Sequence, residues 1–111
     1  MKYGLKESHI QQIQSIFAEY SAIEKAIIYG SRAKGNYRKG SDIDLTLVGP
    51  TLDLNLLLKI ENKLDDLLLP YNIDLSILHK IENLDLIEHI ERVGLIFYEK
   101  SPCFNRLGND F

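Results

Sequence analysis

Two short segments of the chain, residues 43–48 and 73–78, alternate between apolar and polar side chains, and each contains the triplet Ile-Asp-Leu. An alternation with a period of two places the apolar side chains on one face of a β-strand and the polar side chains on the other. The two segments therefore predict strands of a sheet that buries one face and carries aspartates on the opposite face. No other feature of the sequence restricts the fold as strongly, because this one fixes both the strands and the direction of their side chains.

The segments around these strands have the spacing of helices and of further strands. The expected order is a helix over 8–20, a strand over 26–29, a glycine-rich turn with a short helix over 32–37, the strand 43–48, a helix over 53–68, the strand 73–78, a helix over 83–93 and a strand over 95–98. Strands separated by helices indicate an α/β (α+β) fold, a mixed β-sheet flanked by helices. The first two strands could pair antiparallel, because the turn between them is short.

Polar residues at the expected helix starts predict side-chain caps. Ser8 has the spacing of a capping box, Ser31 precedes the short basic helix, and Asn83 begins the last helix. The helix over 53–68 would be capped by Thr51 or Asp53. Its apolar stripe is predicted to consist of Leu54, Leu57, Leu58, Leu64 and Leu68.

The size and composition of the chain limit its organisation. With 111 residues, 45% hydrophobic and 26% charged, it predicts a single domain over 1–100 followed by an irregular C-terminal tail over 101–111. The net charge of −3 argues against direct binding of long nucleic acid through overall positive potential. The single Cys103 cannot form an internal disulfide, and neither a signal peptide nor an apolar run of about 18–20 residues is present. We therefore expect a cytoplasmic protein with no membrane association.

The segment over 30–40 is rich in glycine and is the most basic part of the chain. Its basic residues are Arg32, Lys34, Arg38 and Lys39. Gly30 would let a phosphate approach the backbone closely, and Ser31 would add a hydroxyl at the start of a helix. The segment is not a P-loop, because Asn36 and Tyr37 stand where that motif has lysine and a hydroxyl residue, and no G-x-G-x-x-G motif occurs. It is either a phosphate-binding turn or a basic surface loop.

Three aspartates are candidates for metal binding. Asp42 and Asp44 share a strand face, about 6.5–7 Å apart along the backbone, and Asp74 has the same setting in another strand. If the two strands lie side by side, the three carboxylates meet and repel one another, and Mg²⁺ would compensate their charge. Two such ions can clamp the attacking and leaving oxygens of a phosphoryl displacement. The alternative is an ordinary solvent-exposed sheet face; an EF-hand is excluded, because Leu47 occupies the position of the loop glycine.

The pattern Gly30-Ser31, ten intervening residues and Asp42-Ile43-Asp44 resembles the signature of DNA polymerase β-like nucleotidyltransferases. The fuller string from Gly30 to Gly35, followed by residues 41–45, is most similar to the minimal nucleotidyltransferases (MNT), which pair with HEPN-domain proteins in toxin–antitoxin systems. The resemblance extends from the first helix to the last strand. It implies a polymerase β palm-like nucleotidyltransferase fold.

The resemblance also implies an activity and a set of site residues. Asp42, Asp44 and Asp74 would be the catalytic, metal-binding acids, and the nucleotide would be bound by Gly30, Ser31, Arg32 and Ser41. The implied reaction is Mg²⁺-dependent transfer of a nucleoside monophosphate, AMP from ATP, to a tyrosine hydroxyl of a HEPN partner, as in a protein adenylyltransferase.

Two alternatives to this activity remain open at the level of the sequence. The domain could neutralise a HEPN toxin by contact alone, because it lacks the extra helical domain with which larger relatives bind their acceptor. It could also be a sensor that binds ATP and Mg²⁺ without turnover. Tyr29 could stack on a base, although a strand tyrosine belongs more often to the core. His9, His79 and His89 show no spacing of metal ligands, so we expect surface or half-buried positions.

Overall fold

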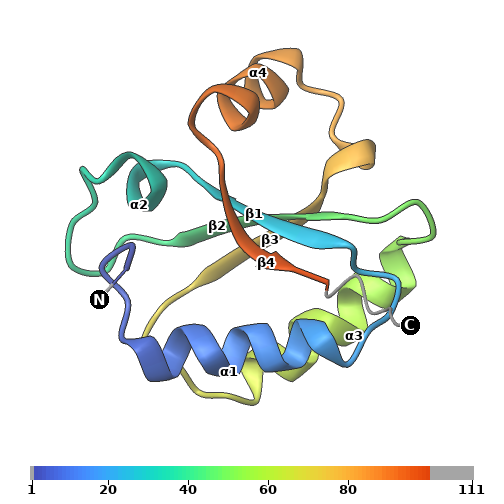
Figure 1. The fold of residues 1–111 in the computed structure, drawn as a ribbon, viewed down its shortest axis with the longest axis horizontal. Coiled ribbons are helices and arrows are strands. Elements are labelled where there is room, and N and C mark those ends of the chain that lie inside the picture. Colours follow the sequence, from blue (N-terminus) through green and yellow to red (C-terminus); the bar gives the residue numbers. More distant parts are fainter. Residues whose placement is uncertain (1, 101–111) are drawn as a thin grey trace, which may run out of the picture.

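The computed structural model describes residues 2–100; the predicted tail over 101–111, with Cys103, lies outside the described residues. The elements are α1 (Glu7–Ala18), β1 (Lys25–Tyr29), α2 (Ser31–Lys34), β2 (Ile43–Val48), α3 (Leu54–Asp65), β3 (Ile73–Ile77), the 3-10 turn η1 (Leu78–Lys80), α4 (Leu84–Val93) and β4 (Leu95–Glu99), labelled in Figure 1 where there is room. Of these, only η1 was not predicted from the sequence.

Four strands form one mixed sheet in the order β3-β2-β1-β4. Strand β1 runs antiparallel to β2 and β4, whereas β2 and β3 run parallel. Figure 1 shows α1 and α3 on one side of the sheet and α4 on the other. These findings confirm the predicted α/β (α+β) fold with a mixed sheet flanked by helices, including the antiparallel pairing of the first two strands.

The sheet face toward α1 and α3 forms the hydrophobic core. Ile43, Leu45 and Leu47 in β2 are fully buried there, as the alternation predicted. Phe17 of α1 and Ile60 of α3 are fully buried against the same face. Burying an apolar side chain of this size contributes about 1.5–3 kcal/mol, so this core is a main source of stability and leaves the opposite face free for polar residues.

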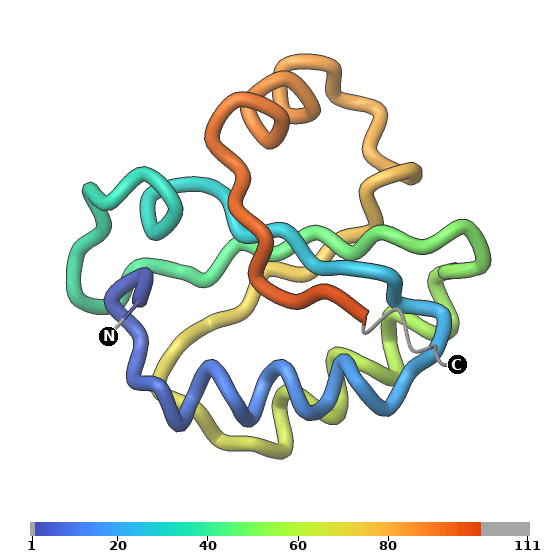
Figure 2. Tube along the Cα trace, viewed as in Figure 1, coloured from blue at the N-terminus to red at the C-terminus, as the bar shows by residue number. Residues whose placement is uncertain are grey.

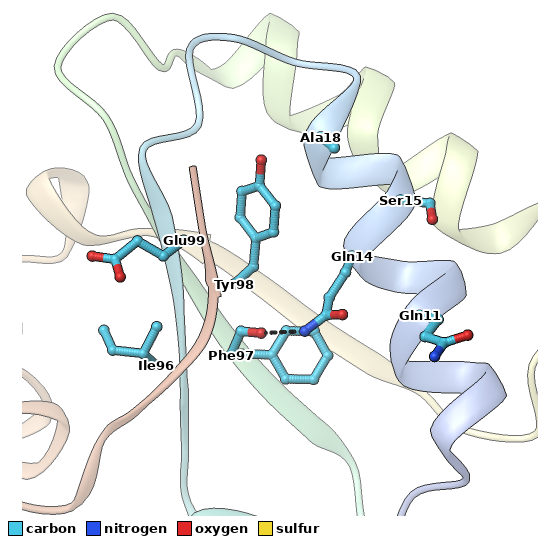
Figure 3. Close-up of a pocket in the computed structure, with 8 residues that line it drawn as sticks. All are labelled: Gln11, Gln14, Ser15, Ala18, Ile96, Phe97, Tyr98 and Glu99. Carbon is cyan, nitrogen blue, oxygen red and sulfur yellow. Dashed lines mark hydrogen bonds between the residues drawn. The ribbon is translucent and has the colours of Figure 1, made fainter. Parts of the chain in front are cut away.

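Helix α1 is also tied to the edge strand β4 by a polar contact. Figure 3 shows Gln14 reaching from α1 to the strand, where its Nε2 donates to the carbonyl oxygen of Phe97 at 2.7 Å. The register between β1 and β4 shifts between Ala26 and Ile27, which leaves Phe97 opposite neither residue. Gln14 therefore satisfies a backbone carbonyl at the position where the sheet is irregular.

Two predicted helix starts are wrong. Helix α1 begins at Glu7 after Lys6, so Ser8 lies inside the helix and does not cap it. The turn before it explains the earlier start, because Leu5 is fully buried and fixes where the chain enters the helix. Helix α2 begins at Ser31 itself, with Gly30 in the capping position, and covers four residues rather than the predicted six. It ends early because Gly35 adopts a left-handed conformation with φ of 87°.

The other two caps are confirmed. The carboxylate of Asp53 accepts a hydrogen bond from the backbone N–H of Leu56 at 2.9 Å, and the side chain of Asn83 accepts one from Leu86 at 3.2 Å. Both residues stand directly before the first turn of a helix, where a side-chain oxygen satisfies an N–H group that lacks an intrahelical partner.

The predicted leucine stripe of α3 is only partly correct. Leu64 is buried, but Leu54 and Leu58 are 65% and 50% exposed, and Leu68 lies beyond the end of the helix. Ile60, which the prediction omitted, is fully buried instead. Within residues 2–100 the longest helices, α1 and α3, have 12 residues each, so no helix there could cross a membrane.

Candidate active site

The polar face of the sheet brings two of the three predicted acids together. In the parallel pair of β2 and β3, Asp44 lies directly opposite Asp74. In the antiparallel pair of β1 and β2, Tyr29 lies opposite Asp44. Neighbouring strands are about 4.8 Å apart, so Tyr29, Asp44 and Asp74 form a row across three strands on one face. The expected side-by-side arrangement of the two aspartate-bearing strands is therefore confirmed.

The third acid, Asp42, stands immediately before β2 and is exposed. It is two residues from Asp44, which directs both side chains to the same side of the chain. Its charge contributes to the pKa of Asp44, so the two carboxylates interact. The structure thus places Asp42 directly before β2, near enough to the pair Asp44 and Asp74 for its charge to act on Asp44.

The electrostatic environment of Asp44 is unfavourable for its charged form. Burial raises the pKa of the Asp44 carboxyl, and the charges of Asp74 and then Asp42 raise it further. His89 and Arg32 oppose this rise in pKa but do not cancel it. A divalent cation would relieve the repulsion that the neighbouring carboxylates exert on the charged form of Asp44.

These acids have the donor chemistry that Mg²⁺ requires, because carboxylate oxygens are its preferred protein ligands. Within residues 2–100, however, no three Asp, Glu, His or Cys side chains are grouped so that together they could hold a metal ion. Metal binding by Asp42, Asp44 and Asp74 therefore stays a prediction. Mg²⁺ usually binds through one or two carboxylates together with water and substrate phosphates, and the pair Asp44 and Asp74 fits this requirement.

Gly30 brings the glycine-rich turn against these acids. Its backbone has φ of 76° and ψ of −155°, a combination that only glycine adopts readily. A Cβ atom at this position would lie 2.4 Å from Oδ2 of Asp44, so the turn and the carboxylate are in direct contact. Ser31 follows as the first residue of α2, where the N–H groups of the first turn have no partner inside the helix.

Arg32 and Ser41, the other predicted nucleotide-binding residues, contact each other. The guanidinium of Arg32, which is 3% exposed, donates two hydrogen bonds to the carbonyl oxygen of Ser41. The hydroxyl of Ser41 accepts a hydrogen bond from the backbone N–H of Arg38 at 2.8 Å. Both residues therefore shape the loop before β2, and their predicted contact with a nucleotide stays untested.

Two further side chains border the acids. Tyr29 is 7% exposed and therefore buried, but it lies on the polar face of the sheet and not in the core between the sheet, α1 and α3. Its ring meets the His89 ring of α4 edge to face at 6.3 Å. Burial raises the pKa of the Tyr29 hydroxyl, and the negative charges of Asp74 and Asp44 raise this pKa further. The neighbouring Ser76 hydroxyl lowers the pKa, although it makes no hydrogen bond of acceptable geometry. The sequence offered no signal for His89, because its position depends on how α4 folds back over the sheet.

The raised pKa of Asp44 predicts a stability effect. Between the ordinary and the raised pKa, the folded protein binds more protons than the unfolded chain, so the free energy of unfolding falls as pH rises through that range. Asp44→Asn removes this penalty. We expect the variant to unfold at a higher temperature than the unsubstituted protein at pH 7 in the presence of EDTA, with the difference shrinking below about pH 4. The exposed Asp66→Asn is the control in the same calorimetric series, and equal behaviour of the two variants would contradict the expectation.

Residues 11–102 match the family described as Polymerase beta, Nucleotidyltransferase. No curated protein sequence matches the chain.

Three solved structures are among those with a similar fold. A toxin–antitoxin crystal structure with AMP-PNP is 21% identical, with a TM-score of 0.66, covering 88% of this chain and 77% of that one. A tri-AMPylated Shewanella oneidensis HEPN toxin in complex with its MNT antitoxin is 17% identical, with a TM-score of 0.63 and coverage of 86% and 74%. The toxin–antitoxin complex MntA-HepT is 18% identical, with the same TM-score and coverage. At these identities the likeness shows a shared fold.

Proposed function

The chain belongs to the polymerase beta nucleotidyltransferase family, and from this premise we propose that it transfers AMP from ATP to a tyrosine hydroxyl of a HEPN-type toxin, for which it is the antitoxin. The observation that carries the proposal is the pairing of Asp44 with Asp74 beside Gly30. A carboxylate with a raised pKa, that of Asp44, lies directly next to a turn suited to phosphate, which is the combination that a metal–triphosphate complex needs.

Each residue has a distinct role in this proposal. Asp42, Asp44 and Asp74 would hold Mg²⁺, two ions in all, and Gly30 and Ser31 would contact the phosphates of ATP through their backbone N–H groups. Bound metal would supply charge neutralisation on the phosphates. The acceptor oxygen forms a bond to the α-phosphorus, the bond from that phosphorus to the bridging oxygen breaks, and pyrophosphate leaves. The proton of the acceptor hydroxyl passes to the carboxylate of Asp74 and then to water.

The acceptor is inferred from the structural neighbours. Solved complexes with this fold contain a HEPN toxin, and in one of them the toxin is AMPylated. These complexes support a partner chain as the acceptor, and the polar sheet face of this chain is open to a second protein at the exposed Asp42 and Asp74. The tyrosine hydroxyl is the acceptor that the resemblance to the minimal nucleotidyltransferases implies.

Neutralisation by binding alone is the second candidate. Of the residues in α4 only Ile90 is buried, although the helix has a pronounced apolar side. Leu84, Leu95 and Ile96 are 78%, 45% and 48% exposed around α4 and β4. Exposed apolar side chains of this kind favour contact with a partner whether or not transfer takes place.

Labelling of the partner tests the proposal. The chain is incubated with a HEPN-type partner protein, ATP labelled at the α-phosphate, and MgCl₂. We expect label on a partner tyrosine, pyrophosphate release in equal amount, and a stepwise increase in the intact mass of the partner by whole AMP units. Binding of the partner without label or pyrophosphate, at millimolar Mg²⁺ and ATP, would leave neutralisation by contact as the function.

A further inference from the structure

Arg32 is a buried cation without a carboxylate partner among the described residues. It is 3% exposed, and the ion pairs found within residues 2–100 join Lys63 to Glu19 and Arg92 to Glu88. Arginine is almost never buried to this extent unless its charge is compensated. Other groups must therefore hold the guanidinium.

Backbone carbonyls and aromatic rings hold it. Nε and Nη2 donate to the carbonyl oxygen of Ser41 at 3.0 and 2.7 Å, and Nη1 donates to that of Tyr3 at 2.9 Å. Cζ lies 5.4 Å from the centre of the Tyr37 ring and 5.2 Å from that of Tyr71, within the range of cation–π attraction. The planar fork of arginine can make these contacts together, whereas a lysine ammonium cannot.

The partners of Arg32 stand next to the proposed catalytic acids. Ser41 directly precedes Asp42, and Tyr71 comes three residues before Asp74. The backbone N–H of Ile43 donates to the carbonyl oxygen of Asn72 at 2.8 Å, so the starts of β2 and β3 are also joined to each other. One side chain thus connects α2, which follows Gly30, with the segments leading into both acid-bearing strands.

The N-terminal segment completes the enclosure. Figure 2 shows it beside the loop that leads from α2 to β2. Tyr3 and Gly4 form a turn with φ of 56° and 71°, and Leu5 behind it is fully buried. The Tyr37 ring lies so close to Gly4 that a Cβ atom there would be 2.3 Å from Cε1 of that ring. The Tyr37 ring is therefore packed directly against the backbone of the N-terminal turn that also supplies the carbonyl of Tyr3.

From these contacts we infer that Arg32 is a positioning residue: it sets Asp42 and Asp74 relative to the Gly30-Ser31 turn and does not contact the phosphates of the nucleotide. The inference rests on the proposed function for its catalytic consequence. Its geometric part concerns only the ordering of the segments around residues 41–43 and 71–72.

Steady-state transfer kinetics separate positioning from phosphate contact. Arg32→Lys keeps the charge and loses the fork, so we expect kcat to fall about 10- to 100-fold, as for other residues that orient metal ligands, with little change in KM for ATP. The concentration of Mg²⁺ at half-maximal rate should rise. A direct phosphate contact predicts the opposite split, with kcat retained and KM for ATP increased, and that result would overturn the inference.

A second pair of variants tests the same inference while leaving Arg32 unsubstituted. Tyr71→Leu removes one of the two rings that flank the guanidinium, whereas the matched Tyr71→Phe keeps the ring and loses only the contact of the hydroxyl with His9 at 3.3 Å. We expect Tyr71→Leu to shift kcat and the Mg²⁺ requirement as Arg32→Lys does, and Tyr71→Phe to match the unsubstituted protein. Equal kinetics of the two Tyr71 variants, or losses that merely follow the unfolded fraction measured by circular dichroism, would overturn the inference.

Hydrogen exchange makes the test independent of turnover. The amides of Ser41 and Ile43 donate to Arg38 and Asn72 in the braced segments, and the amide of Leu57 in α3 is the remote control. In Arg32→Lys and Tyr71→Leu we expect faster exchange at Ser41 and Ile43 and unchanged exchange at Leu57. If the unsubstituted protein transfers no AMP while this exchange pattern appears, the proposed function fails and the positioning role stands. Unchanged exchange at Ser41 and Ile43 would overturn the positioning role.

Discussion

Replacing Asp42 and Asp44 together by asparagine is expected to lower AMP transfer to the partner roughly 1000-fold or more. The carboxylates are proposed to hold the metal that neutralises the triphosphate, an effect of several kcal/mol, and about 1.4 kcal/mol corresponds to a factor of ten in rate. Folding should be preserved, because Asp42 is exposed and the charged form of Asp44 is unfavourable in the folded protein. The measurement is single-turnover labelling with α-labelled ATP, alongside thermal unfolding.

The matched control for this variant is Asp65→Asn together with Asp66→Asn. These two exposed aspartates lie at the end of α3, on the other side of the sheet, and their replacement changes the net charge by the same amount. The control should label the partner at the normal rate. Retained labelling by Asp42→Asn/Asp44→Asn would exclude the proposed mechanism. Lost labelling with continued protection of cells from the toxin would show that binding alone is enough for neutralisation.

Gly30→Ala is expected to reduce transfer about 100-fold and to destabilise the fold. The added Cβ would lie 2.4 Å from Oδ2 of Asp44, so either the turn or the carboxylate must move. A displacement of about 1 Å at a catalytic group can cost a factor of about 100 in rate, and the backbone strain adds about 1–3 kcal/mol. Single-turnover labelling and chemical unfolding measure the two effects separately.

Gly40→Ala is the control for backbone strain without displacement. Gly40 has φ of 88°, similar to the 76° of Gly30, but no atom lies within 4 Å of where its Cβ would be. We expect it to lose about 1–2 kcal/mol of stability and to keep transfer. If Gly30→Ala and Gly40→Ala reduced transfer equally, the contact between Gly30 and Asp44 would have no part in catalysis.

The sheet could be predicted because the alternation of apolar and polar residues that indicates a strand lies within a short segment of the sequence. Burial of one face forces the alternation seen in β2 and β3, and the short turn between β1 and β2 allowed their antiparallel pairing. The proximity of Asp44 and Asp74 was predictable only on the condition that β2 and β3 are neighbours. Sequence spacing cannot supply that condition, because it depends on how α3 returns the chain to the sheet.

The contacts of Arg32 and the position of His89 could not be predicted from the sequence. A basic residue after Gly30-Ser31 is typical of a phosphate ligand, yet the guanidinium of Arg32 contacts Tyr3 and Tyr71, which are distant in the chain, as well as the nearby Tyr37. The cap at Ser8 was mispredicted for a related reason, since burial of Leu5 moved the helix start. In each case a tertiary contact decided an outcome that local preference could not.

The carbonyl of Tyr3 has a practical consequence for anyone who shortens or tags this protein. Because it accepts a hydrogen bond from Arg32, the described residues before α1, residues 2–6, contribute to the enclosure of the Arg32 guanidinium. A truncation that begins at Glu7 would remove this acceptor together with Gly4, against which Tyr37 packs. Such a fragment would lack part of the enclosure of a buried cation, so its inactivity would say nothing about the chemistry of the aspartates.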